Sequence, residues 1–163
     1  QIVNPLYDKA FKYLMENERL AKKVISVILD EEIEELHLSQ QETLVPDTKH
    51  QLTLFRLDFK AIILKPDGTK HKVLIELQKS KFDTDSKRFR AYLGSNYLKT
   101  DMEKNASGEE IKVSYPIITI YILGYKVDDI PYMAVTVNRQ VINSVSKEPV
   151  TIKSDFIEQL NHR

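Results

Sequence analysis

The sequence predicts an α/β fold in which a mixed β-sheet is flanked by helices, in the order helix, strand, strand, strand, helix, strand, strand. Three observations predict it: an amphipathic run of helical period near the start, two strand-like runs joined by a Pro-Asp-Gly turn, and a nearly continuous β-branched run after a second helical segment. Because a helix between two strands is the usual crossover, we expect the strand after it to pair in parallel with a hairpin strand.

The first half of the chain supplies one helix and three strands. Apolar side chains recur at three-and-four spacing from Asp8 to Asp30, which predicts a single helix. A first strand is expected from Leu38 to Val45. The second and third strands are expected at residues 51–64 and 71–78, on either side of a turn at residues 65–69.

The second half supplies the other helix and two more strands. We expect the helix from Thr84 to about Glu103, where the Asn105-Ala-Ser-Gly108 segment ends it. The segment Tyr115–Leu123 is almost entirely apolar and β-branched, which predicts a central strand covered on both faces. A shorter strand is expected at Met133–Val137, followed by an irregular tail.

The composition predicts a single domain over residues 1–163 and narrows the function classes. Lysine plus arginine and aspartate plus glutamate number 24 each, so a nucleic-acid surface would have to be a local patch. The absence of cysteine excludes disulfides, thiolate nucleophiles and cysteine-based metal sites. No apolar run reaches the roughly 18 residues of a membrane span, so a cytoplasmic protein is expected. A capped helix starts at Ser154 just before the chain stops, and we expect further residues beyond Arg163.

The hairpin turn predicts which residues face each other. Pro-Asp-Gly suits a three-residue loop that closes with glycine in the left-handed region, so that Lys65 faces Thr69. Counting outward places Asp58 opposite Glu76, with Cβ atoms roughly 4.5–5.5 Å apart. The same count places Lys60 and Gln78 on this face of the hairpin.

Two facing carboxylates among apolar runs have two interpretations. They can share a Mg²⁺ ion, whose bonds to oxygen are about 2.1 Å long. Alternatively they are solvated surface charges with Lys60, Lys72 or Arg56 as salt-bridge partners. The apolar runs on both strands favour a site, because a strand covered on both faces would bury the carboxylates. The pattern alone leaves both interpretations open.

The order of elements, with Asp58 on the second strand and Glu76-Leu77-Gln78 on the third, resembles the PD-(D/E)XK nuclease superfamily, which has a restriction-endonuclease-like fold. More narrowly, it is similar to the group of recombination-promoting nucleases and transposases. The resemblance covers about residues 4 to 123. It also includes the segments Pro5-Leu-Tyr-Asp-Lys-Ala-Phe-Lys12, Arg88-Phe-Arg-Ala-Tyr92 and Pro116-Ile-Ile-Thr-Ile-Tyr-Ile-Leu123.

The resemblance implies a metal-dependent DNA endonuclease of the transposase or recombination-promoting type. Asp58, Glu76 and the backbone carbonyl of Leu77 would hold Mg²⁺, with Mn²⁺ as the alternative ion. Asp8 would reach the metal or its water, although an acid in a first helical turn more often stabilises the helix dipole. Gln78 stands where most of the superfamily has lysine. It can donate a hydrogen bond but carries no charge, so we expect weaker catalysis or a cation from elsewhere, with Lys60 the nearest.

A basic cluster after Glu76 is expected to hold DNA phosphates. Its members are Lys79, Lys81, Lys87, Arg88 and Arg90, with Tyr92 beside them. The plain alternative is a solvated helix face, with Tyr92 in the core. DNA is therefore the expected partner and a membrane is not. The oligomeric state is left open, a homodimer included.

Two other functions compete with the nuclease. The first is a catalytically weak or inactive module of nuclease fold that serves DNA binding or protein assembly, which Gln78 and the neutral net charge favour. The second is a purely structural interaction domain in which the paired acids are ordinary surface charges.

Overall fold

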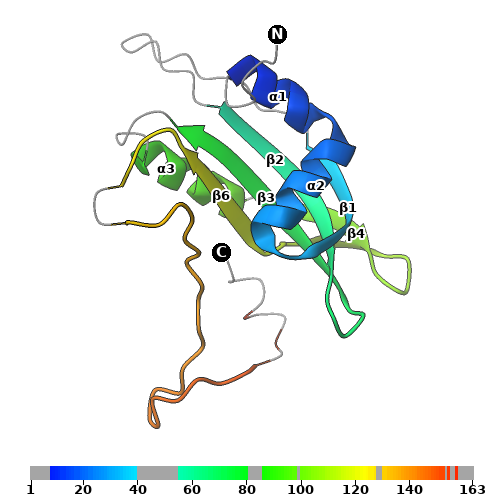
Figure 1. Cartoon of the computed structure of the whole chain (residues 1–163). Coiled ribbons are helices and arrows are strands. Elements are labelled where there is room, and N and C mark those ends of the chain that lie inside the picture. The colour runs from blue at the N-terminus through cyan, green and yellow to red at the C-terminus, as the bar shows by residue number, and fades with distance from the viewer. Residues whose placement is uncertain are drawn as a thin grey trace.

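The core of the molecule is a mixed sheet of four strands, β1 (Glu32–Leu38), β2 (Phe55–Leu64), β3 (Lys70–Ser80) and β6 (Ile117–Leu123) (Figure 1). The computed structural model describes residues 8–39, 55–80, 86–98, 100–127, 130–152, 154 and 157. The strand order is β1-β2-β3-β6. β2 is antiparallel to both β1 and β3, whereas β6 is parallel to β3. The predicted α/β class, the mixed sheet and the parallel crossover are confirmed.

The hairpin between β2 and β3 has the expected turn. The backbone N–H of Lys65 donates to the carbonyl of Thr69 at 2.9 Å, and the N–H of Gly68 donates to the carbonyl of Lys65 at 2.8 Å. Gly68 has φ +80°, a left-handed conformation that glycine adopts without steric cost. Asp58 therefore pairs with Glu76, as predicted.

The predicted helix from Asp8 to Asp30 is in fact two helices, α1 (Asp8–Glu16) and α2 (Glu18–Leu29). Asn17 between them is extended, with φ −82° and ψ 101°, and its side-chain oxygen accepts a hydrogen bond from the N–H of Leu20 at 3.2 Å. Asparagine is a favoured N-cap residue because it satisfies a helical N–H that has no partner within the helix. The periodicity of the sequence continues across the break and hides it.

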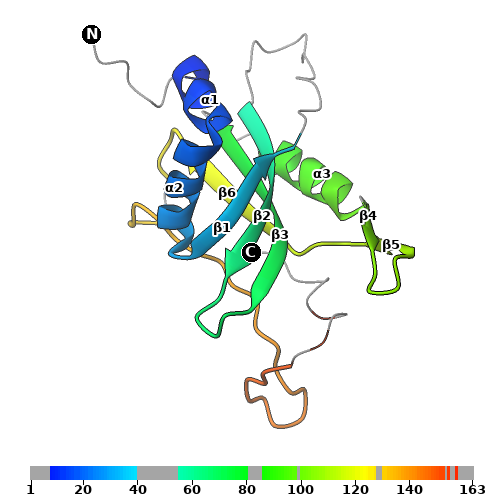
Figure 2. The same ribbon diagram turned by 90° about the vertical axis from the view of Figure 1, so that its right-hand side faces the viewer.

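Helices α1 and α2 cover one face of the sheet (Figure 2). That face is apolar because alternate residues of each strand point to it. The largest buried side chains in this core come from all layers: Met15 and Ile25 from the helices, and Leu57, Phe59, Ile63, Ile75 and Leu77 from the strands.

The opposite face carries α3 (Ser86–Tyr97) and a small hairpin of β4 (Asp101–Lys104) and β5 (Glu110–Val113) (Figure 2). The prediction that the helix runs from Thr84 to Glu103 is wrong at its C-terminal end. The Asn105–Gly108 segment is not a helix stop but the turn of this hairpin. The N–H of Asn105 donates to the carbonyl of Glu109 at 2.9 Å, and Gly108 has φ +82°.

The first strand lies earlier than predicted, since β1 ends at Leu38 and Ser39 is in no strand. The remainder of the predicted strand, from residue 40, lies outside the described residues. The register between β1 and β2 shifts between Ile33 and Glu35, which makes Glu34 the extra residue of a bulge. The buried residues Ile33 and Leu36 are consequently three apart, and the period-two pattern of a strand is absent from the sequence.

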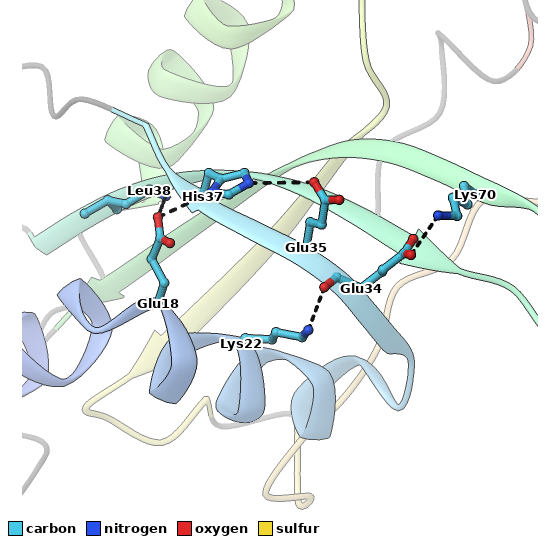
Figure 3. A network of polar contacts seen from close by, with 7 residues as sticks. All are labelled: Glu18, Lys22, Glu34, Glu35, His37, Leu38 and Lys70. Atoms are coloured by element: carbon cyan, nitrogen blue, oxygen red, sulfur yellow. Dashed lines mark hydrogen bonds and ion pairs between the residues drawn. The ribbon is translucent and has the colours of Figure 1, made fainter.

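The bulge lies in a polar network between the outer edge of β1 and helix α2 (Figure 3). Lys22 Nζ donates to the backbone carbonyl of Glu34 at 2.6 Å, and Lys70 Nζ lies 2.7 Å from Glu34 Oε1. The N–H of Leu38 donates to Glu18 Oε1 at 3.2 Å. Side chains of α2 thus occupy backbone groups that an edge strand otherwise presents to another chain.

Two predictions for the C-terminal part are wrong. Among the described strands β6 is at the edge of the sheet, not at its centre, and Tyr121 and Leu123 on it are each more than one third exposed. Residues Met133–Val137 form no strand, and the chain after β6 runs away from the sheet there (Figure 1). The tail after Asn138 is irregular as expected, apart from a single bridge between Ile142 and Pro149. Most of the helix expected from Ser154 lies outside the described residues.

Candidate functional site

The candidate site lies on the sheet face beneath α3. Asp58 of β2 and Glu76 of β3 are directly paired and therefore point to the same side, away from the apolar core. Asp58 is half-buried, whereas Glu76 is only 1 % exposed and Gln78, two residues further along β3, is 0 % exposed. A carboxylate and an amide are therefore buried side by side, a costly arrangement unless both are hydrogen-bonded.

Two neutral amides hold the Glu76 carboxylate, one on each oxygen. Gln78 Nε2 donates a short hydrogen bond to Glu76 Oε1. Asn96 of α3, itself 5 % exposed, donates from Nδ2 to Glu76 Oε2 at 3.0 Å. These bonds fix the carboxylate from two directions, one donor coming from its own strand and the other from the helix above it.

The amide oxygen of Gln78 is an orphan. It is buried and, among the described residues, no donor lies within hydrogen-bonding distance of it. A buried acceptor without a partner costs about 1–3 kcal/mol. Turning the amide over would not help, because it would place the oxygen against the Glu76 carboxylate. This oxygen can accept a hydrogen bond from a water molecule or bind a cation.

These oxygens suit a hard cation such as Mg²⁺. Within the described part of the chain no group of three or more histidine, cysteine, aspartate or glutamate side chains is arranged to hold a metal. The carboxylates of Asp58 and Glu76 would provide two ligands, and the amide oxygen of Gln78 is a further oxygen on the same face of β3. Mg²⁺ commonly takes one or two protein carboxylates and completes its shell with water and substrate phosphate, so the residues present fit it.

Strand β6 adds two hydroxyl groups to this face. Thr119 is paired with Glu76, and Tyr121 is paired with Gln78. Burial raises the pKa of Tyr121 above its ordinary value and the charge of Glu76 adds to this, while a hydrogen bond with Thr119 acts in the opposite direction. Tyr121 is therefore a neutral phenol at physiological pH, able to donate a hydrogen bond at the rim of the site.

Lys60 lies on the predicted face but is already paired. Its Nζ is 2.6 Å from Oδ1 of Asp101 on β4, and its side chain is half-exposed. Lys72 is bonded in the same way to Glu103 of β4, which also accepts a hydrogen bond from the hydroxyl of Tyr115. These contacts attach the small hairpin to the sheet and leave Lys60 beside the site.

The contacts between the β4–β5 hairpin and the sheet also shift the pKa values of Glu103 and Tyr115. The hydrogen bonds from Lys72 and Tyr115 hold the pKa of Glu103 below its ordinary value. Burial, together with the bond to Glu103, raises the pKa of Tyr115 well above its ordinary range.

The predicted DNA-contacting residues do not form one group. Lys79 is 6 % exposed and lies on the core face, where its Nζ is 5.6 Å from the ring centre of Phe11, so it does not share a surface with Glu76. Arg90 is exposed on α3. Lys81 is outside the described residues.

Other predicted site residues are placed only by their backbone. Arg88 and Tyr92 are on α3 and Asp8 begins α1, and the side chains of all three are outside the described part. The side chain of Leu77 is in the core, on the other face from Glu76.

Sequence reasoning missed Asn96, Thr119 and Tyr121 as members of the site. Asn96 was visible only as an amide within the apolar stripe of a helix. The signal for the other two is their alternation with the buried residues Ile118 and Ile120 in β6.

Comparison with known proteins found no relative of this chain. No family model, no curated protein and no solved structure matches this chain. The described helices also include none with the length and apolar character needed to cross a membrane.

Proposed function

We propose that this protein is a Mg²⁺-dependent DNA endonuclease of the recombination-promoting or transposase type. The observation that carries the proposal is Glu76, a buried carboxylate paired across the hairpin with Asp58 and held by two amides. A neutral apolar residue would be cheaper at such a position unless the charge is used. The resemblance to the PD-(D/E)XK superfamily supports the same assignment.

The residues have distinct roles in this proposal. Asp58, Glu76 and the carbonyl of Leu77 would hold the metal, and a bound Mg²⁺ would lower the pKa of a water and neutralise charge on the scissile phosphate. The NH₂ group of Gln78 donates to Glu76, so the amide oxygen is available to accept a hydrogen bond from that water. Because Gln78 is uncharged, the site lacks the cation that lysine supplies elsewhere in the superfamily.

In this proposal, the positive charge that Gln78 does not provide comes from a residue at the rim of the site. Lys60 can supply it if DNA phosphate displaces its partner Asp101, because the two side chains are 51 % and 33 % exposed and such ion pairs are weak in water. Arg88, Arg90 and Tyr92, all on α3, are the proposed DNA contacts. Lys79 is not one of the proposed DNA contacts, because its side chain lies on the core face of the sheet, over Phe11.

The decisive experiment is nicking of supercoiled plasmid with Mg²⁺ or Mn²⁺ and with EDTA. Wild-type protein should nick only with metal, and Asp58→Asn and Glu76→Gln should abolish nicking while the proteins stay folded. Glu110→Gln, a matched change at an exposed carboxylate on β5, should nick like wild type. Equal nicking by all four proteins would end the proposal.

The second candidate is a module of nuclease fold that binds DNA or assembles with protein but does not cut. The uncharged Gln78 and the neutral net charge favour it. Calorimetry separates the two: duplex DNA binding without any Mg²⁺ or Mn²⁺ binding at millimolar metal would support the module.

A further inference from the structure

Asn96 occupies a position where an apolar residue would be expected. It lies near the end of α3, on the side of the helix that meets the sheet, and it is almost completely buried. Asparagine is a poor helix former, and a buried amide is costly unless it is used. Its Nδ2 donates a hydrogen bond to Glu76 Oε2 at 3.0 Å.

We propose that Asn96 is a positioning residue that orients the Glu76 carboxylate for the metal; the inference rests on the proposed function. Asn96 and Gln78 hold opposite oxygens of one carboxylate, so together they determine the rotation of that group about its last bond. A carboxylate offers about four lone-pair positions, so it can accept hydrogen bonds and also bind a cation.

The amides of Gln78 and Asn96 restrain the Glu76 carboxylate relative to different parts of the protein. Gln78 is on the same strand as Glu76, so its bond restrains the carboxylate only relative to β3. Asn96 comes from α3, so its bond also ties the helix to the metal-binding face of the sheet. Partners of this kind, which hold a ligand without touching the metal, are worth roughly 10–100-fold in metal affinity.

The test is Mn²⁺ binding to the whole chain by calorimetry, without DNA. Asn96→Leu keeps the branching of the side chain but removes the donor, and we expect its dissociation constant for Mn²⁺ to rise roughly 10–100-fold. Asn96→Gln restores a donor on a longer side chain and should recover part of the affinity. Ser95→Ala, at an exposed position of the same helix, should bind like wild type.

Folding and binding are measured separately. The fold of each variant is checked by circular dichroism and thermal unfolding. If Asn96→Leu does not fold, Mn²⁺ binding by Asn96→Ser is compared with that of wild type instead. A purely structural role would lower the unfolding temperature and leave the Mn²⁺ dissociation constant unchanged in the folded fraction, and that result overturns the inference.

Two reference variants separate this inference from the proposed function. Asp58→Asn and Glu76→Gln should each abolish Mn²⁺ binding. If they do and Asn96→Leu binds as wild type does, only the role of Asn96 is refuted. If wild type binds no Mn²⁺, or if both reference variants bind it normally, the metal site itself is refuted and the inference with it.

Discussion

Replacing Glu76 by glutamine should remove metal binding at little cost to the fold. The carboxylate accepts hydrogen bonds from Gln78 and Asn96, and it is 1 % exposed. Hydrogen bonds to charged groups contribute about 1.5–3 kcal/mol and neutral ones about 0.5–1.5 kcal/mol, so neutralising the acceptor of two bonds costs roughly 2–3 kcal/mol. Against this, burying an ion costs several kcal/mol even after relaxation, and Glu76→Gln removes that cost.

The new amide can also be accommodated. The NH₂ group of the introduced glutamine would face an NH₂ group of Gln78 or Asn96. If the side-chain amide of Gln78 turns over, its oxygen can accept a hydrogen bond from the new NH₂ group. The two effects nearly cancel, so without metal we expect the free energy of unfolding of Glu76→Gln to lie within about 1 kcal/mol of wild type or above it.

Urea unfolding followed by circular dichroism, in EDTA and in Mn²⁺, measures both effects. At a metal concentration 100 times the dissociation constant, wild type should gain about 2.7 kcal/mol and the variant nothing. In a thermal scan this gain corresponds to roughly 5–11 °C. A loss of more than about 3 kcal/mol in EDTA would show that the carboxylate is structural, and an equal gain from Mn²⁺ in both proteins would show that Glu76 is no ligand.

Other changes should have equally definite results. Gln78→Lys introduces the missing cation and should raise metal-dependent plasmid nicking roughly tenfold or more; an unchanged rate would show that this charge is not limiting. Asp30 ends α2 with φ 53°, so Asp30→Gly should raise the free energy of unfolding by about 0.5–1 kcal/mol in urea titrations. The folded pKa of Glu103 is lowered, so its contribution to stability is present above its ordinary value of 4.5 and is lost as the pH falls through the folded value. Unfolding measured against pH should therefore show wild type and Lys72→Met converging in acid. The pKa of Tyr115 is raised, so its contribution is present below its ordinary value of 10.0 and is lost above it, and wild type should lose its advantage over Tyr115→Phe in alkali.

The parts of the fold that follow from local chemistry could be predicted. The Pro-Asp-Gly turn determines its own geometry, and the register of β2 against β3 follows from it by counting. The break at Asn17 could not be seen, because the apolar periodicity continues across it. The bulge at Glu34 removed the alternation that would have revealed β1. The Asn105–Gly108 turn closes in the same way as the first hairpin, but β4 and β5 have only four residues each, too few to show a period.

The candidate site was likewise predictable only where it depends on local sequence. Asp58 and Glu76 belong to one hairpin, so their pairing follows from its turn. Asn96 reaches Glu76 only because α3 docks at a particular depth and rotation on the sheet, which is a property of the packed protein. The position of Met133–Val137 depends likewise on whether a neighbouring strand is present, and among the described residues none pairs with it. A β-prone composition does not by itself provide a partner.

The bulged edge of β1 also has a consequence for how this sheet can grow. The side chains of Glu18 and Lys22 occupy backbone groups of Leu38 and Glu34 on that edge, so an incoming strand would first have to displace them. The other end of the described strand order is β6. A strand that joined the sheet beside β6 would lie next to Tyr121, one strand away from Glu76. Growth of the sheet on that side and access to the proposed metal site would then compete for the same margin of the protein.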